Sequence, residues 1–283
     1  MSRVVVGVDG SAAADEAFRV ALEEARLRGA ELTVVSAWTN RRMALAPSTL
    51  PPRPSAMEAH ALETITRSLR MAGASATDAV VKPLQMAAGP ALVEASRDAD
   101  LLVVGARGRA GVRDHLLGST SEHCVQHAAC PVLVVRRPVP TAGCRVVVGI
   151  AAGSHEQGAL EQAVLEGRLR CGTVEAVHAW SGPGETTLPY APAVAALEGM
   201  AGEARSVLDR AVDKVDQSGL AEPITRTVLA YGAFSGLVDV AHRADLMVVG
   251  GPAHGPIVGR LMGSVSTQLV HHAPCSVMVV RDR

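Results

Sequence analysis

A chain of 283 residues can form one large domain or two domains of ordinary size. Apolar residues make up 48% of it and charged residues 19%, which excludes a disordered chain and is enough for a buried core. The formal net charge is −1, with arginine and acidic residues interspersed, so we expect neither a nucleic-acid-binding nor a membrane-binding surface.

The first half alternates short β-branched runs with longer helical patterns. The runs are almost continuously apolar, which is typical of parallel strands covered on both faces. Strand–helix alternation predicts right-handed crossovers and a parallel sheet. The expected strands are 4–8, 32–38, 77–84, 101–105 and 132–135, and the expected helices are 12–28, 56–72, 90–97 and 117–128.

The second half repeats this order after about 142 to 145 residues. The segments 99–136 and 244–281 align without gaps and share 18 identical residues. The expected strands of this half are 145–150, 173–180, 224–229, 246–250 and 277–280. We therefore predict two tandem, doubly wound, five-stranded α/β domains: residues 1–137, a linker at 138–143 that contains proline and glycine, and residues 144–283.

A glycine-rich loop follows the fourth strand, at the end of a parallel sheet where ligands bind. We expect its glycines to allow close backbone approach and positive φ angles. A helix that begins at the following Gly-Ser-Thr offers free N–H groups and a dipole to an anion, with help from one of the arginines. The candidate residues are Gly105, Ala106, Arg107, Gly108, Arg109, Ala110 and Gly111, followed by Gly118, Ser119 and Thr120.

The spacing Gly105-x2-Gly108-x9-Gly118-Ser119 resembles the nucleotide-binding signature of the universal stress protein family. The opening Val6-Gly7-Val8-Asp9-Gly10-Ser11 and the closing segment 127–135 also resemble that family. The resemblance extends over both halves. It implies the adenine nucleotide alpha hydrolase-like form of the fold.

The resemblance also implies an ATP site in the first domain. Asp9 and Ser11, with the backbone of Gly7 and Val8, would hold the nucleoside, and Ala37 would lie against the adenine. The segments 105–111 and 118–120 would enclose the ribose and the phosphates, usually with Mg²⁺ or Mn²⁺. The alternative is that these glycines only form turns.

The second copy departs from this pattern. Ala151 stands where the first domain has Asp9, Ala253 replaces the middle glycine, and Pro252 and Pro256 each remove an N–H donor. Loss of the carboxylate could cost about 1.5–3 kcal/mol, roughly tenfold or more in affinity. We predict that the second domain binds nucleotide weakly or not at all. The alternative is that both domains bind it, because backbone contacts tolerate substitution.

Other patterns give weaker hypotheses. His123, His127 and Cys130 could ligate zinc, but His127 and Cys130 belong to the closing segment, so a structural role is favoured. No P-loop or convincing general base is present, so we predict a binding protein with no catalytic residues and not an enzyme. The alternatives are slow ATP hydrolysis or autophosphorylation at Ser119 or Thr120, or a structural stress protein with vestigial pockets.

The last predicted strand of each half is short and apolar, and would form a sheet edge that needs covering. The resemblance implies that the two edges pair within the chain as a pseudo-dimer, and a homodimer is compatible with this. A short linker with two prolines disfavours independent domains. The segment 39–55 is expected to form a flap. No secretory signal is recognisable and the five cysteines contain no C-x-x-C pair, so we expect a cytoplasmic protein with an unknown protein partner.

Overall fold

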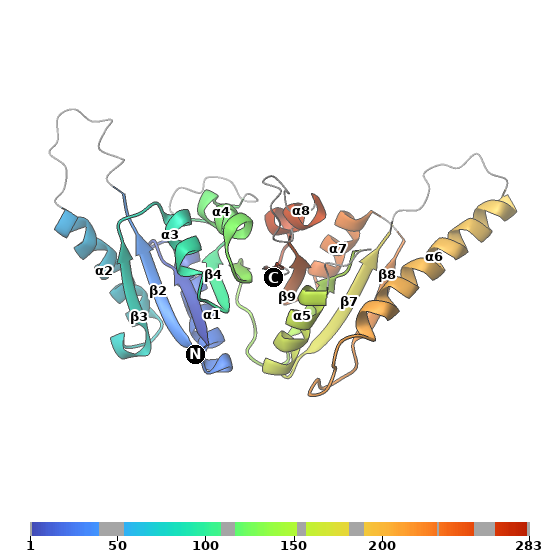
Figure 1. The fold of residues 1–283 in the computed structure, drawn as a ribbon, viewed down its shortest axis with the longest axis horizontal. Coiled ribbons are helices and arrows are strands. Elements are labelled where there is room, and N and C mark those ends of the chain that lie inside the picture. The colour runs from blue at the N-terminus through green and yellow to red at the C-terminus, as the bar shows by residue number, and fades with distance from the viewer. Residues whose placement is uncertain are drawn as a thin grey trace, which may run out of the picture. The chain divides into compact units, whose positions relative to one another are not determined.

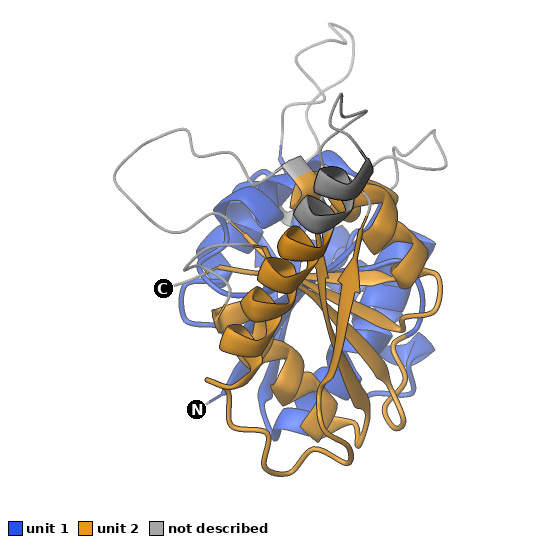
Figure 2. Cartoon of the chain, turned by 90° about the vertical axis from the view of Figure 1, so that its right-hand side faces the viewer, with its two compact units in different colours: residues 1–138 blue, residues 139–283 orange. Residues whose placement is uncertain are grey.

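The structure is a computed structural model that describes residues 2–39, 54–108, 117–151, 157–180, 190–230, 232–251 and 264–281. The chain divides into two compact units, Met1–Pro138 and Val139–Arg283 (Figure 2). Strands and helices alternate in each unit, as the sequence predicts (Figure 1). The pairing of the two units as a pseudo-dimer stays a prediction.

Unit 1 has a five-stranded parallel sheet in the order β3-β2-β1-β4-β5. Its register pairs Val5 with Thr33 on one side and with Leu102 on the other. The elements are β1 Arg3–Gly7, α1 Ala12–Arg28, β2 Glu31–Ala37, α2 Pro54–Met71, the 3₁₀ turn η2 Ala76–Asp78, β3 Val80–Leu84, α3 Ala88–Ala95, β4 Leu101–Gly105, α4 Ser119–His127 and β5 Val132–Val135.

Helices cover both faces of this sheet. Helix α1 packs on β1 and β4 and contacts α2, whereas α3 packs on β1 and β2 and contacts α4. The central strands are therefore apolar on both sides: Val4, Val5 and Val6 of β1 are fully buried, as are Leu102 and Val103 of β4. The near-continuous apolar runs in the sequence reflect this double burial.

Unit 2 repeats the arrangement in the order β10-β9-β6-β7-β8. Helix α5 packs on β6 and β9, and α7 packs on β6 and β7. The elements are β6 Arg145–Gly149, α5 Gln157–Leu169, β7 Thr173–Ala179, α6 Tyr190–Val212, β8 Thr225–Leu229, α7 Ala233–Ala241, β9 Leu246–Gly250, α8 Ser264–His272 and β10 Ser276–Val280.

Both copies bury an ion pair near the end of their first helix. In α1 the buried carboxylate of Glu24 pairs with Arg28, and in α5 that of Glu166 pairs with Arg170. The spacing of four residues places each pair on one helix face. Because the two pairs match, they show which residues of α1 and α5 correspond to each other in the repeat, with an offset of 142 positions.

Several element boundaries differ from the sequence prediction by one to three residues, and two of them have a local explanation. The third strand begins at Val80 instead of Thr77, because Asp78 accepts hydrogen bonds from the backbone N–H and the hydroxyl of Ser75 and forms a 3₁₀ turn there. Helix α3 begins at Ala88 instead of Pro90. Proline is tolerated at this place because the N–H groups of a first helical turn have no partner within the helix.

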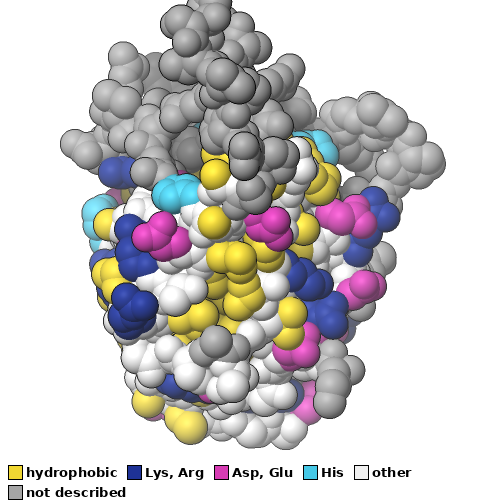
Figure 3. Space-filling view, turned by 90° about the vertical axis from the view of Figure 1, so that its left-hand side faces the viewer, with side chains coloured by type: hydrophobic (Ala, Val, Ile, Leu, Met, Phe, Trp, Pro, Cys, Tyr) yellow, Lys and Arg dark blue, Asp and Glu magenta, His cyan; other side chains and the backbone are white. Residues whose placement is uncertain are grey.

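Charged side chains of both signs lie among one another on the face of the molecule seen in Figure 3, with apolar side chains between them. The exposed large apolar residues of unit 1 come from α2, from β3 and from the turn after β3: Leu62, Met71, Val80 and Met86. None of the described helices combines the length and the hydropathy that a membrane span requires.

Candidate functional site

A cavity of about 500 Å³ opens at the carboxyl ends of the strands of unit 1. The strand order reverses between β1 and β4, because the chain leaves β1 toward α1 on one face and leaves β4 toward α4 on the other. A crevice forms where two such connections diverge, and ligands of open α/β sheets bind there. The position of the cavity therefore follows from the topology.

The predicted site residues differ in how they relate to this cavity. Ten of them line it: Gly7, Val8, Asp9, Ala37, Gly105, Arg107, Gly108, Gly118, Ser119 and Thr120. Ser11 and Ala106 are not among the lining residues. Arg109, Ala110 and Gly111 lie outside the described residues. Additional lining residues that the sequence analysis did not single out are Ala14, Val35, Ala88, Leu92, Val104, Leu117 and Ser121.

Asp9 lies in the short loop between β1 and α1. One oxygen of its carboxylate, Oδ1, accepts a hydrogen bond of 3.0 Å from the backbone N–H of Ser11. The Ser11 hydroxyl in turn accepts a hydrogen bond of 3.2 Å from the N–H of Ala14, so Ser11 is the N-cap of α1. The loop therefore positions the Asp9 carboxylate at the edge of the cavity while Ser11 starts the helix.

Two of the predicted glycines lie at close contacts and not at special backbone angles. A Cβ atom on Gly108 would lie 2.9 Å from Oδ2 of Asp9, and one on Gly105 would lie 2.7 Å from the carbonyl oxygen of Ala13. The expectation of positive φ is wrong for both of them, since neither is among the positive-φ residues. The missing side chain of Gly105 lets the end of β4 approach the first turn of α1, and that of Gly108 lets the following loop pass beside Asp9.

Helix α4 begins at the cavity. Its N-cap residue, Gly118, has no side chain with which to accept a hydrogen bond from the first turn. The N–H groups of this turn are left for an external acceptor, and the helix dipole favours a negative charge there. Ser119 and Thr120, which also line the cavity, add two hydroxyl groups. This end of the cavity is suited to an anion.

Ser121 holds this helix start against the sheet, a role that the sequence analysis missed. Its buried hydroxyl donates a hydrogen bond of 2.6 Å to the carbonyl oxygen of Gly105. Unit 2 has the same contact, from Ser266 to the carbonyl oxygen of Gly250 at 2.9 Å. The signal was present in the sequence, because Ser121 and Ser266 are identical residues at matching positions of the repeat.

The charge of the cavity comes from two side chains among its described lining residues, Asp9 and Arg107. An anion would be repelled by the first and attracted by the second. A ligand with one uncharged, donor-rich end and one anionic end would satisfy both. The apolar wall formed by Val35, Ala37 and Leu92 offers a surface for a flat, weakly polar group.

The described residues hold no group of three or more His, Cys, Asp or Glu side chains that could bind a metal ion by themselves. His123 and His127 stack with their ring centroids 4.3 Å apart, and Nδ1 of His127 lies 2.9 Å from the carbonyl oxygen of His123. Burial, followed by the proximity of His127, lowers the pKa of His123. These contacts favour the structural role over zinc ligation.

Much of the corresponding region of unit 2 lies outside the described residues, including residues 152–156 and 252–263. Of the residues named for the second copy, Ala151 and Gly250 are described, whereas Pro252, Ala253 and Pro256 are not. The side chain of Ala151 is a methyl group, whereas unit 1 has the carboxylate of Asp9 at the corresponding position. The described part of unit 2 thus repeats the strands of the site without its acidic group.

The fold is that of an α/β protein with a cavity at the switch point of a parallel sheet. The model of the universal stress protein family matches residues 1–136 and again residues 144–281. The chain therefore belongs to the universal stress protein family, in a tandem form.

Related proteins match this chain over nearly their whole length. A universal stress protein of Mycobacterium tuberculosis (strain H37Rv) is 31% identical over 295 residues, covering 99% of this chain and 97% of its own. Another from the same strain is 32% identical over 303 residues, with the same coverage. The crystal structure of a universal stress protein from Archaeoglobus fulgidus covers 99% of this chain with a TM-score of 0.65 and 16% identity, which shows the fold.

Proposed function

We propose that unit 1 binds ATP and that the chain acts as a nucleotide-dependent module in a stress response. The observation that carries this proposal is the cavity at the switch point, where the start of α4 and the carboxylate of Asp9 line the same space. The cavity volume of about 500 Å³ is in the range of small-molecule sites.

The polyphosphate would bind at the start of α4. Backbone N–H groups supply most of the donors there, with Ser119, Thr120 and Arg107 beside them. Mg²⁺ usually coordinates substrate phosphates, water and one or two carboxylates, so a cavity with one carboxylate fits a metal that arrives on the nucleotide. Mg²⁺ or Mn²⁺ would neutralise phosphate charge. Arg109, Ala110 and Gly111 belong to this part of the proposal.

The nucleoside would bind toward Asp9 and the end of β2. A carboxylate only accepts hydrogen bonds, so Asp9 suits ribose hydroxyls or ring N–H donors and not phosphate. Ala37 and Val35 at the end of β2, with Leu92 of α3, provide the apolar wall for the adenine. Gly7 and Val8 contribute backbone beside Asp9, and Ser11 contributes by fixing the loop.

Binding is favoured over turnover by the composition of the cavity. Its described lining contains no histidine, lysine or cysteine, and its one carboxylate is engaged with the N–H of Ser11. A general base needs a position next to the attacking group and a pKa near the working pH. We therefore propose a sensor and not an ATPase, working in the cytoplasm with a protein partner.

Two measurements test the proposal. Mass spectrometry of small molecules released from the purified protein should find an adenine nucleotide, and calorimetry on the emptied protein should show ATP binding that Mg²⁺ strengthens. Protein that carries no nucleotide and gives no heat with ATP would refute the proposal in favour of a structural stress protein with vestigial pockets. Phosphate release above background, abolished by Gly108→Val, would favour a slow ATPase instead.

A further inference from the structure

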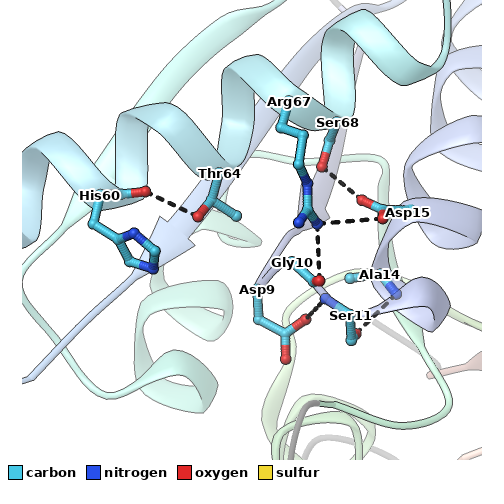
Figure 4. Close-up of polar contacts among 9 residues, drawn as sticks. All are labelled: Asp9, Gly10, Ser11, Ala14, Asp15, His60, Thr64, Arg67 and Ser68. Atoms are coloured by element: carbon cyan, nitrogen blue, oxygen red, sulfur yellow. Dashed lines mark hydrogen bonds and ion pairs between the residues drawn. The ribbon is translucent and has the colours of Figure 1, made fainter.

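A polar cluster connects α2 to the loop that carries Asp9 (Figure 4). Nη2 of Arg67 donates to the carbonyl oxygen of Gly10 at 2.8 Å and lies 3.3 Å from Oδ2 of Asp15. The Ser68 hydroxyl donates to Oδ1 of Asp15 at 2.9 Å. Both carboxylate oxygens of Asp15, in the first turn of α1, are thus held by two neighbouring residues of α2.

Gly10 is the residue on which this cluster acts. Its φ angle is +82°, a conformation that favours glycine, and it stands between Asp9 and the helix cap Ser11. A Cβ on Gly10 would lie 3.2 Å from Nη2 of Arg67, so the guanidinium packs directly on this turn. In Figure 4 the Asp9 carboxylate lies on the side of the loop away from α2. The orientation of Gly10 therefore sets where that carboxylate points.

Comparing unit 1 with unit 2 separates contacts that both copies of the fold contain from contacts that only unit 1 contains. The bond from Ser121 to Gly105 is kept in unit 2, so it belongs to the fold. Counting from the matching buried pairs in α1 and α5 places Gln157 at the position of Asp15. The buried apolar residues of α2 and α6 place Ala211 at the position of Ser68.

The same alignment places Arg210 at the position of Arg67, so unit 2 keeps the arginine. It lacks the acidic acceptor and the serine donor of this cluster, and it also lacks the carboxylate that corresponds to Asp9. A fold that forms without these groups does not require them. Asp15 and Ser68, which order Arg67 in unit 1, are present where Asp9 is present, which points to a role of the ordered arginine in the site.

We propose that Arg67 is a positioning residue of the nucleotide site. It is held by Asp15, which Ser68 holds in turn, and it fixes the Gly10 carbonyl and through it the Asp9 carboxylate. This inference rests on the proposed function. Arg67 is not among the residues that line the cavity, so it acts through the loop and not by contact with the ligand. The cluster also joins α2, which follows the segment 40–53, to the site.

A positioning role and a charge effect predict different results. Arg67 carries a positive charge near the site, and loss of charge alone would weaken ATP more than uncharged adenosine. Misplacement of Asp9 would weaken both ligands equally, because Asp9 serves the nucleoside. We expect Arg67→Met to weaken ATP and adenosine alike by about tenfold, and Ser68→Ala by about threefold.

The experiment is calorimetry with ATP and with adenosine on the full chain. Arg70→Met is the matched control, since it removes the same charge from the exposed face of the same helix and should leave both affinities unchanged. Arg67→Lys should restore part of the affinity. In the Asp9→Ala variant, adding Arg67→Met should lower the two affinities little further, because the carboxylate that Arg67 positions is already absent.

Amide hydrogen exchange provides a readout that needs no ligand. Arg67→Met should speed exchange at residues 10–14 while the melting temperature stays within a few degrees, and Ser68→Ala checks the result if the first variant folds poorly. Unchanged affinity, a loss confined to ATP, or a full effect in the Asp9→Ala background would each overturn the inference. If the wild-type protein binds neither ligand, the proposed function fails, and unchanged exchange at residues 10–14 would separately overturn the role of Arg67.

Discussion

Gly108 and Asp9 illustrate how single atoms shape the site. The two residues are almost a hundred positions apart, yet Oδ2 of Asp9 lies 2.9 Å from where a Gly108 Cβ would be. Real Cβ atoms do not approach an oxygen so closely, so a side chain at position 108 must displace the carboxylate. The absence of a side chain at Gly108 therefore leaves room for the Asp9 carboxylate in its observed position.

We predict that Gly108→Ala weakens ATP binding by about tenfold or more, because the carboxylate must rotate away from its place and lose its hydrogen bond. Calorimetry on the purified variant measures this. Gly202→Ala is the control, because Gly202 lies in α6 and nothing lies within 4 Å of its missing Cβ. ATP affinity equal to that of the wild type would contradict the close contact.

The cysteines give a second prediction at the residue scale. Four of them are buried and Cys171 is exposed. Burial raises the pKa values of Cys124 and Cys144 to about 12, so at pH 8 only about one in ten thousand of either thiol is the reactive thiolate.

A disulfide reagent at pH 8 should therefore titrate one thiol rapidly in the native protein and all five in denaturant. Cys171→Ser should remove the rapid reaction and leave the four buried thiols, which react only slowly in the native protein. Two or more rapid thiols in the native wild type would show that the buried cysteines are accessible.

At the scale of elements, the ends of the two first helices are the same turn made with different residues. In unit 1, α1 ends with Gly29 in the left-handed conformation at φ 57°, and Ala30 donates to the carbonyl oxygen of Ala25. In unit 2, Gly172 makes the matching bond to Gly167, but Cys171 stands at the place of Gly29 with φ 45°. Among the described residues it is the one non-glycine with a positive φ.

We predict that Cys171→Gly stabilises unit 2 by about 0.5–1 kcal/mol, since relief of the left-handed strain outweighs the greater freedom of glycine in the unfolded chain. Urea denaturation followed by circular dichroism measures the change. The reciprocal variant Gly29→Ala should destabilise unit 1 by a similar amount. An unchanged or lower midpoint for Cys171→Gly would show that the turn carries no strain.

The boundaries of elements show what local sequence signals miss. The strands were predicted well because buried parallel strands are apolar on both faces, and that pattern is local. The start of β3 was predicted too early because the Ser75–Asp78 contact competes with the strand. The role of Ser121 was missed because its partner, Gly105, belongs to another element.

At the scale of the whole molecule, the two units share a fold and differ at a residue of the proposed site. Unit 2 keeps the strands, the buried ion pair of its first helix and the serine that holds its last helix. It has Ala151 instead of an acidic residue after its first strand. Among the described residues, the two units therefore share packing contacts and differ at the position of Asp9.

We predict that calorimetry finds one high-affinity ATP site per chain. Asp9→Ala should lower the affinity of that site by about tenfold, since it removes a hydrogen-bonding carboxylate. Two equal sites that both survive this substitution would contradict the asymmetry and show that backbone contacts are sufficient in unit 2.

The sequence by itself determined the duplicated α/β architecture, the membership of the family and most residues that line the cavity, because these depend on local periodicity and on motifs of fixed spacing. Only the tertiary structure decided which groups meet across elements. Arg67 and Gly10 are 57 positions apart, and their contact depends on how α2 packs beside α1. Such contacts arise from packing between elements, and no pattern within one element records them.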